Sequence, residues 1–120
     1  MRRRRVLVVD DDAGVLEAIK IILRNSGFRV KVMSKTNKFE EVMGKFKPEL
    51  VLLDIWMPML SGVELCMMLK DSDKFKNIPV VLLSASNRVK KISKKCRADD
   101  YLTKPFDMEA LIKVIKKNLD

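Results

Sequence analysis

The stretch from Glu49 to Gly62 constrains the fold of this chain more than any other. It begins with four apolar residues, Leu50–Leu53, a length and composition typical of a strand buried on both faces of a sheet. Asp54 ends that run, and Ser61 and Glu64 follow after a loop at the spacing of a capping box, which predicts a helix start. A carboxylate between a buried strand and a helix is where open α/β sheets place their functional groups, although it could also simply end the strand and solvate a turn.

Four further segments repeat this alternation of an apolar strand and a helix. The alternation predicts a doubly wound, five-stranded parallel sheet with helices on both faces, the flavodoxin-like α/β architecture. The length predicts a single domain over residues 1–120, large enough for a core without disulfides or metal staples. The other strands are predicted over Arg5–Val9, Phe28–Met33, Val80–Leu83 and Tyr101–Thr103.

Capping residues predict where the helices begin. Asp12 precedes the first helix, and Asn37 stands three residues before Glu40, the spacing of a cap for the second. Asp107 is expected to cap the last helix, whose inward face would carry Met108, Leu111, Ile115 and Leu119.

Polar residues follow the predicted strands at the points where they end. Because right-handed crossovers place the carboxyl ends of parallel strands along one edge, we expect the polar residues there to converge. Clustered carboxylates suit a hard divalent cation such as Mg²⁺, and a lysine and a serine beside it would complete a site for a phosphoryl group. The residues at this edge are Asp10, Asp11, Asp54, Ser84 and Lys104.

The composition excludes several classes of functional site. The chain has no histidine, which excludes histidine-based triads, histidine metal sites and a phosphohistidine within it. Cys66 and Cys96 lie far apart among apolar helical positions and are expected to be buried free thiols in a reducing cytoplasm. No apolar run has the length of a membrane span or a signal peptide, so no membrane partner is expected.

The net charge of +9 leaves the surface strongly basic. Such a surface could attract nucleic acid, acidic protein faces or anionic lipid, or it could be only a solvated, self-repelling exterior.

The motifs, taken in order, resemble the receiver domain of two-component response regulators, the CheY-like family. The resemblance runs from Arg4 to Leu119, and all four matching motifs occur in the family's order. They are Val9-Asp10-Asp11, Asp54 with Met57-Pro58 and Gly62, Ser84-Ala85, and Asp99–Phe106.

The resemblance implies a function. Asp54 matches the phosphoacceptor, which takes a phosphoryl group from a sensor histidine kinase, a phosphotransfer protein or a small acyl phosphate. The domain would be a signalling phosphoacceptor, not an enzyme acting on other substrates. Lys104 would pair with the phosphoryl oxygens, Ser84 would donate its hydroxyl, and the backbone N–H groups of Trp56 and Ala85 would complete the oxygen shell.

The family's metal is Mg²⁺, with Mn²⁺ as a substitute. Asp11 and Asp54 match side-chain ligands, Asp10 would act largely through water, and Trp56 would contribute its backbone carbonyl.

The resemblance also implies a switch. Ser84 and Tyr101 match the hydroxyl and the aromatic side chain that move on phosphorylation, although Tyr101 could simply cover the core at the end of a strand. The Lys104–Pro105 peptide bond matches one that is cis in this family.

Two departures from the family pattern concern the face that receivers usually present to their outputs. The interval from Ser84 to Lys104 is slightly short, which predicts a clipped fourth helix, and Arg97 replaces a small glycine. We expect a downstream protein at the face formed by the fourth helix, fifth strand and fifth helix, and no direct DNA binding by this domain alone. Six bases without an acid lie between Ser86 and Ala98, and this segment would favour an acidic partner.

Two other classes of function compete with this interpretation. An aspartate-nucleophile, magnesium-dependent phosphatase usually has a second aspartate two residues after the nucleophile, where this chain has Trp56. A basic nucleic-acid-binding module would rest on electrostatics alone, since no aromatic residues alternate with the bases and no recognition-helix pattern occurs.

Overall fold

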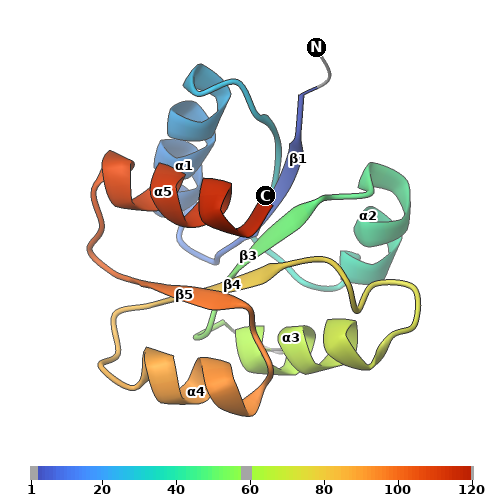
Figure 1. Ribbon diagram of the computed structural model, residues 1–120. Coiled ribbons are helices and arrows are strands. Elements are labelled where there is room, and N and C mark those ends of the chain that lie inside the picture. The colour runs from blue at the N-terminus through green and yellow to red at the C-terminus, as the bar shows by residue number, and fades with distance from the viewer. Residues whose placement is uncertain (1–2, 58–60, 120) are drawn as a thin grey trace.

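One parallel sheet forms the centre of the molecule. The computed structural model describes residues 3–57 and 61–119; Pro58, part of one of the matching motifs, lies outside this range. The strands are hydrogen-bonded in the order β2-β1-β3-β4-β5, which confirms the predicted doubly wound sheet (Figure 1). Their bounds are β1 Arg5–Val9, β2 Arg29–Met33, β3 Leu50–Asp54, β4 Val80–Ser84 and β5 Asp100–Thr103.

Helices cover both faces of the sheet (Figure 1). α1 and α5 pack with Val6, Val8 and Leu52 in one core, and α2, α3 and α4 pack with Leu7 and Leu53 in the other. Their bounds are α1 Ala13–Asn25, α2 Phe39–Phe46, α3 Gly62–Asp71, α4 Val89–Lys95 and α5 Met108–Leu119. Each core takes alternate residues of the central strands, which is why β3 and β4 are buried along their whole length.

The helix starts follow the predicted caps in three cases. The Asp12 side chain accepts the N–H groups of Gly14 and Val15. Ser61 and Glu64 form the predicted capping box of α3. The Asp107 carboxylate accepts the N–H of Ala110 at 2.7 Å.

Two details of the helix predictions are wrong. Asn37 does not cap α2: its N-cap is Lys38, without a side-chain cap bond, because the N–H of Phe39 instead donates to the carbonyl of Thr36 at 3.1 Å. Met108 does not face inward and is 58% exposed. It is the first residue of α5, and the helix reaches its core only from Leu111 onward.

α4 is short, as predicted, and ends on an unusual residue. Arg97 lies in the left-handed region at φ 64°, and the N–H of Ala98 donates to the carbonyl of Ser93 at 2.9 Å. This is a Schellman closure with arginine where glycine is usual, at a cost of about 1–2 kcal/mol. The Arg97 guanidinium forms an ion pair with Asp71, which ties the end of α4 to α3.

The two cysteines are buried free thiols, as predicted, and the Cys66 thiol donates to the carbonyl of Cys96 at 3.4 Å. Among the helices of the described ranges, none is long and apolar enough to cross a membrane.

Gly62 allows α3 to begin directly against the end of β3. A Cβ at this position would lie 2.1 Å from the carbonyl oxygen of Asp54 and 2.8 Å from its carbon, both of them backbone atoms. The N–H of Gly62 donates to the carbonyl of Ile55 at 3.1 Å and fixes this approach. The loop that leaves Asp54 can therefore return to the sheet only with glycine at this point.

We predict that Gly62→Ala destabilises the fold by about 1–3 kcal/mol or more, because the backbone of Asp54 must move to admit the methyl group. Gly44→Ala is the matched control: it lies inside α2, and its Cβ would meet nothing closer than the Lys74 Nζ at 4.0 Å. Alanine there should stabilise the protein by about 0.5–1 kcal/mol through helix propensity. Urea unfolding measures both, and equal effects of the two changes would contradict the role assigned to Gly62.

Candidate phosphoacceptor site

The carboxyl ends of four strands bring the predicted residues together. Asp10 directly follows β1, Asp54 ends β3, Ser84 ends β4, and Lys104 directly follows β5. The sheet order places β1 beside β3, and consecutive crossovers leave this point in opposite directions. In open α/β sheets, such a switch point is where ligands bind.

A buried ion pair holds the centre of the site. The Asp10 side chain is fully buried, and its Oδ2 accepts from the Lys104 Nζ at 2.7 Å. Its other oxygen accepts the N–H of Asp12 at 3.0 Å. The backbone N–H of Lys104 donates to the carbonyl of Ser84 at 2.8 Å, so β4 and β5 together aim the lysine at the carboxylates.

Asp54 lies within reach of the same lysine. Its Oδ1 is 3.7 Å from the Lys104 Nζ, and the side chain is 8% exposed. The N–H of Trp56 points back at Asp54 Oδ1, at a distance of 3.4 Å. Burial, followed by the Asp10 carboxylate, raises the pKa of Asp54 to about 6, against the lowering effect of Lys104.

Three carboxylates offer a set of oxygen ligands. One oxygen from each of Asp10, Asp11 and Asp54 can be chosen so that all lie within 4.8 Å of one another. Asp11 is exposed and the other two are buried, so the cluster opens toward solvent on one side. Hard oxygen donors with an open side fit Mg²⁺ or Mn²⁺, which keep water or phosphate oxygens in their coordination shells. The residues present therefore fit the expected metal.

The remaining predicted residues lie beside this cluster. Ser84 is 1% exposed, and its Oγ accepts the N–H of Ser86 at 3.0 Å. Ala85, the next residue, is exposed. Tyr101 of β5 is half-buried against the core of α2, α3 and α4 and pairs in register with Leu82. Trp56 is 66% exposed.

The ion pair of Lys104 with Asp10 was not anticipated from the sequence. Neither were two hydrogen bonds: the Asp12 N–H on the Asp10 carboxylate and the Ser86 N–H on the Ser84 hydroxyl. Both link residues two apart after a strand end. The turns that such side chains favour were the signal available in the sequence.

The sheet order and the acidic edge together define the class of flavodoxin-like α/β domains with a polar site at the switch point. The chain belongs to the response regulator receiver domain family, whose model matches residues 6–116. It is thus a signalling domain of the two-component type that works through phosphorylation, as the motifs predicted.

Relatives of known sequence agree with this assignment. The DNA-binding response regulator MtrA of Mycobacterium tuberculosis is 33% identical over 119 residues, which cover 98% of this chain and 51% of that protein. The phosphate regulon transcriptional regulatory protein PhoB of Pseudomonas aeruginosa is 33% identical over 117 residues, 94% of this chain and 50% of that protein. The chain therefore spans about half the length of these relatives.

Solved structures share the fold. A putative response regulator from Chloroflexus aurantiacus superposes with a TM-score of 0.93 at 27% identity and covers 98% of both chains. A receiver domain from Bermanella marisrubri gives a TM-score of 0.89 at 28% identity and covers 99% of this chain and 100% of that one.

The raised pKa of Asp54 predicts a pH-dependent cost of folding in the absence of metal. The folded protein holds a proton on Asp54 up to about pH 6, whereas the unfolded chain loses it near pH 4, so stability falls as pH rises through this window. The neutral, isosteric Asp54→Asn change should raise the free energy of unfolding by on the order of 3 kcal/mol above pH 7, and this gain should vanish near pH 4.

Thermal unfolding in chelator at a series of pH values tests this prediction. Asp11→Asn is the matched control, because its side chain is exposed and its removal should give a much smaller gain. A gain for Asp54→Asn that is independent of pH would contradict the electrostatic origin of the cost.

Proposed function

We propose that Asp54 is the residue of this receiver domain that accepts the phosphoryl group. One observation carries the proposal: Asp54 is a buried strand-end carboxylate that lies 3.7 Å from an ammonium and within the cluster of three carboxylates. No other described carboxylate combines a strand-end position beside Lys104 with an opening to solvent, since Asp10 is fully buried and already bonded to that lysine.

An Oδ atom of Asp54 attacks the phosphorus of a phosphohistidine on a partner protein, or of a small acyl phosphate, and the bond to the donor nitrogen or oxygen breaks. Lys104 then neutralises charge on the phosphoryl oxygens, for which its ammonium must move from Asp10 toward Asp54. A divalent metal bound by Asp10, Asp11, Asp54 and the Trp56 carbonyl would neutralise the remaining charge.

Ser84 and two backbone N–H groups complete the proposed phosphoryl shell. The Trp56 N–H already points at Asp54 Oδ1, and Ala85 follows the strand that ends beside Asp54. The Ser84 hydroxyl would turn from its contact with Ser86 to a phosphoryl oxygen, and Tyr101, at the neighbouring strand, would move inward as it does so.

A phosphatase function has less support. The position for a general acid, two residues after Asp54, is Trp56, which cannot transfer a proton and whose side chain is largely exposed. Receiver domains are signalling phosphoacceptors, and we propose that residues 1–120 form one such unit with no further enzymatic activity. The buried free thiols suit the cytoplasm, where its kinase would present the phosphohistidine.

The proposed output face consists of α4, β5 and α5. All six bases of the α4 segment are exposed, and no acid stands among them. Ser84 and Lys104 stand at the two ends of the segment that contains α4 and β5. A movement of these residues at the phosphoryl group therefore reaches this segment first. We propose an acidic protein surface as the partner, and no direct contact of this face with DNA. The bases of the segment are Arg88, Lys90, Lys91, Lys94, Lys95 and Arg97.

We predict that acetyl phosphate with Mg²⁺ adds one phosphoryl group to the protein, and that Asp54→Asn abolishes the addition, because an amide is not a nucleophile under these conditions. Intact mass spectrometry measures both. Asp12→Asn is the matched control: Asp12 caps α1, lies outside the carboxylate cluster and should leave the modification intact.

The same samples test the switch. Amide chemical shifts should change most from Ser84 to Thr103 on phosphorylation, and a Ser84→Ala variant should still be phosphorylated but should lose the change near Tyr101. Full modification of the Asp54→Asn variant would rule out the assignment of the phosphoacceptor.

A further inference from the structure

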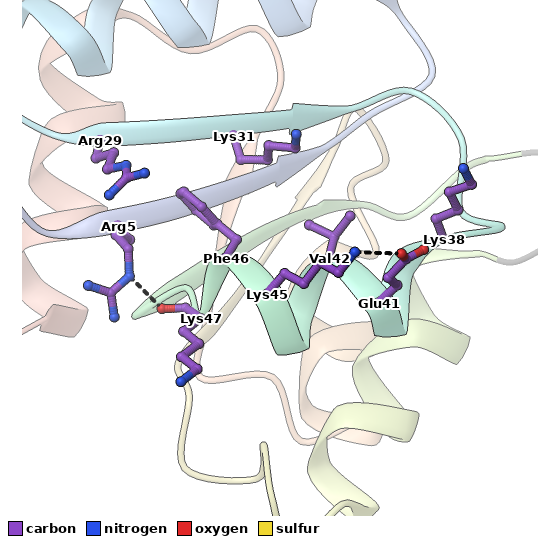
Figure 2. Close-up of a pocket in the computed structure, with 9 residues that line it drawn as sticks. All are labelled: Arg5, Arg29, Lys31, Lys38, Glu41, Val42, Lys45, Phe46 and Lys47. Carbon is purple, nitrogen blue, oxygen red and sulfur yellow. Dashed lines mark hydrogen bonds and ion pairs between the residues drawn. The ribbon is translucent and has the colours of Figure 1, made fainter.

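A basic groove runs between the edge strand β2 and helix α2. It encloses about 580 Å³, and Figure 2 shows its lining side chains around the space between the two elements. None of them belongs to the acidic cluster. The lining residues are Arg5, Arg29, Lys31, Lys38, Glu41, Val42, Lys45, Phe46 and Lys47.

The groove is open because β2 presents a charged side chain where the neighbouring strands present apolar ones. On the face covered by α2, the central strands present Leu7, Val51 and Leu82, all buried. In register beside Leu7 of β1 stands Lys31 of β2, an exposed lysine. A charged side chain at this position keeps α2 over β1 and β3 and leaves the face of β2 open.

The groove carries six cations and one acid. Its acid, Glu41, is held by Lys45 at 3.0 Å, and Arg5 is engaged with Glu49 at 3.4 Å. Within the part of the chain that the structure describes, Lys31, Lys38 and Lys47 form no ion pair, and all three are exposed. These three lysines are therefore available to an anionic ligand.

The spacing of the cations favours an extended ligand. Lys38 is the N-cap of α2 and Lys47 is its C-cap, at the two ends of the helix. The eight residues between them span about 12 Å at about 1.5 Å per residue. A chain with a phosphate at every unit can reach cations along this whole length, whereas a compact anion can engage only one end.

One aromatic ring lies among the bases. Phe46 projects from α2 toward β2 (Figure 2), is half-buried, and has the Arg29 guanidinium 5.9 Å from its ring centroid. Stacking on an aromatic ring or on a guanidinium plane is how proteins hold a nucleobase without reading its sequence. Val42 supplies the only aliphatic side chain of the lining.

We propose that the groove between β2 and α2 binds single-stranded nucleic acid. The phosphates lie along Lys38, Lys31 and Lys47, and one base stacks at the Phe46–Arg29 pair. The chemistry is that of a phosphodiester chain with bases, and nothing in the lining distinguishes DNA from RNA. For DNA, the proposal departs from the expectation drawn from the sequence, that this domain alone does not bind it.

The test uses the full chain and labelled oligothymidylate or oligouridylate of about eight nucleotides, within the usual site size of such grooves. Fluorescence anisotropy at a series of salt concentrations gives the affinity and its salt dependence. Replacing Lys31 and Lys38 together by glutamine should weaken binding by roughly tenfold at low salt. It should also reduce the slope of log K against log salt by about 1.4, since each phosphate contact to a single strand contributes about 0.7.

The matched control removes two exposed bases elsewhere: Arg24→Gln, in the last turn of α1, with Lys76→Gln, after the end of α3. This variant has the same net charge as the first and should bind within about twofold of the parent protein. Equal losses in the two double variants would overturn the proposal, because binding would then follow net charge and not the groove.

A third variant, Phe46→Leu, tests whether a nucleobase stacks on the aromatic ring. Leucine keeps the apolar contact with the core but removes the ring, so oligonucleotide binding should fall at least about fivefold while binding of inorganic polyphosphate stays unchanged. If polyphosphate or polyglutamate of matched charge competes as well as the oligonucleotide, the ligand is a polyanion of another class and the proposal is wrong. Comparison of the two oligonucleotides then shows whether DNA or RNA is preferred.

Discussion

The ion pair between Lys104 and Asp10 is the interaction on which the functional edge of this protein depends. Asp10 is fully buried and lies 2.7 Å from the ammonium, in a place where an unpaired carboxylate would be costly. Removing the lysine would cost about 3–5 kcal/mol, because the Asp10 carboxylate would be left buried without a cation. The pair connects the first strand of the sheet to the residue that follows the last one, so that the site and the fold form together.

The same arrangement sets the charge balance around Asp54, the proposed phosphoacceptor. Lys104 is bonded to Asp10 and lies 3.7 Å from Asp54, so the charge of Asp54 is only partly compensated, and its side chain stays buried with a raised pKa. A divalent metal would supply the positive charge that this cluster of three carboxylates and one ammonium lacks, and it would offset the negative charge of a phosphoryl group. Gly62 completes the geometry, because a side chain there would displace the backbone of Asp54. A change in charge at Asp54 therefore acts directly on the residues at the ends of β1, β4 and β5.

Local patterns in the sequence predicted much of this. The composition of Leu50–Asp54 predicts a buried strand, and the spacing of Ser61 and Glu64 predicts a helix cap. The topology of the sheet then brings Asp10, Asp54 and Lys104 to one edge. The predictions that failed depended on how the helices and strands lie relative to one another. Asn37 has the residue type of a cap, but the carbonyl of Thr36 takes the bond. The basic groove was missed, because its existence depends on the lateral position of α2 over the sheet, which no local pattern of charges contains.

In the proposed function, the acidic edge directs a phosphoryl group to one side chain, Asp54. Reduction of the phosphorylated protein with borohydride converts an acyl phosphate to an alcohol, and peptide mass mapping then locates the modified residue. The account predicts homoserine at position 54 and unmodified aspartate at positions 10 and 11. Modification at Asp10 or Asp11, or a borohydride-resistant phosphate on Ser84, would contradict it.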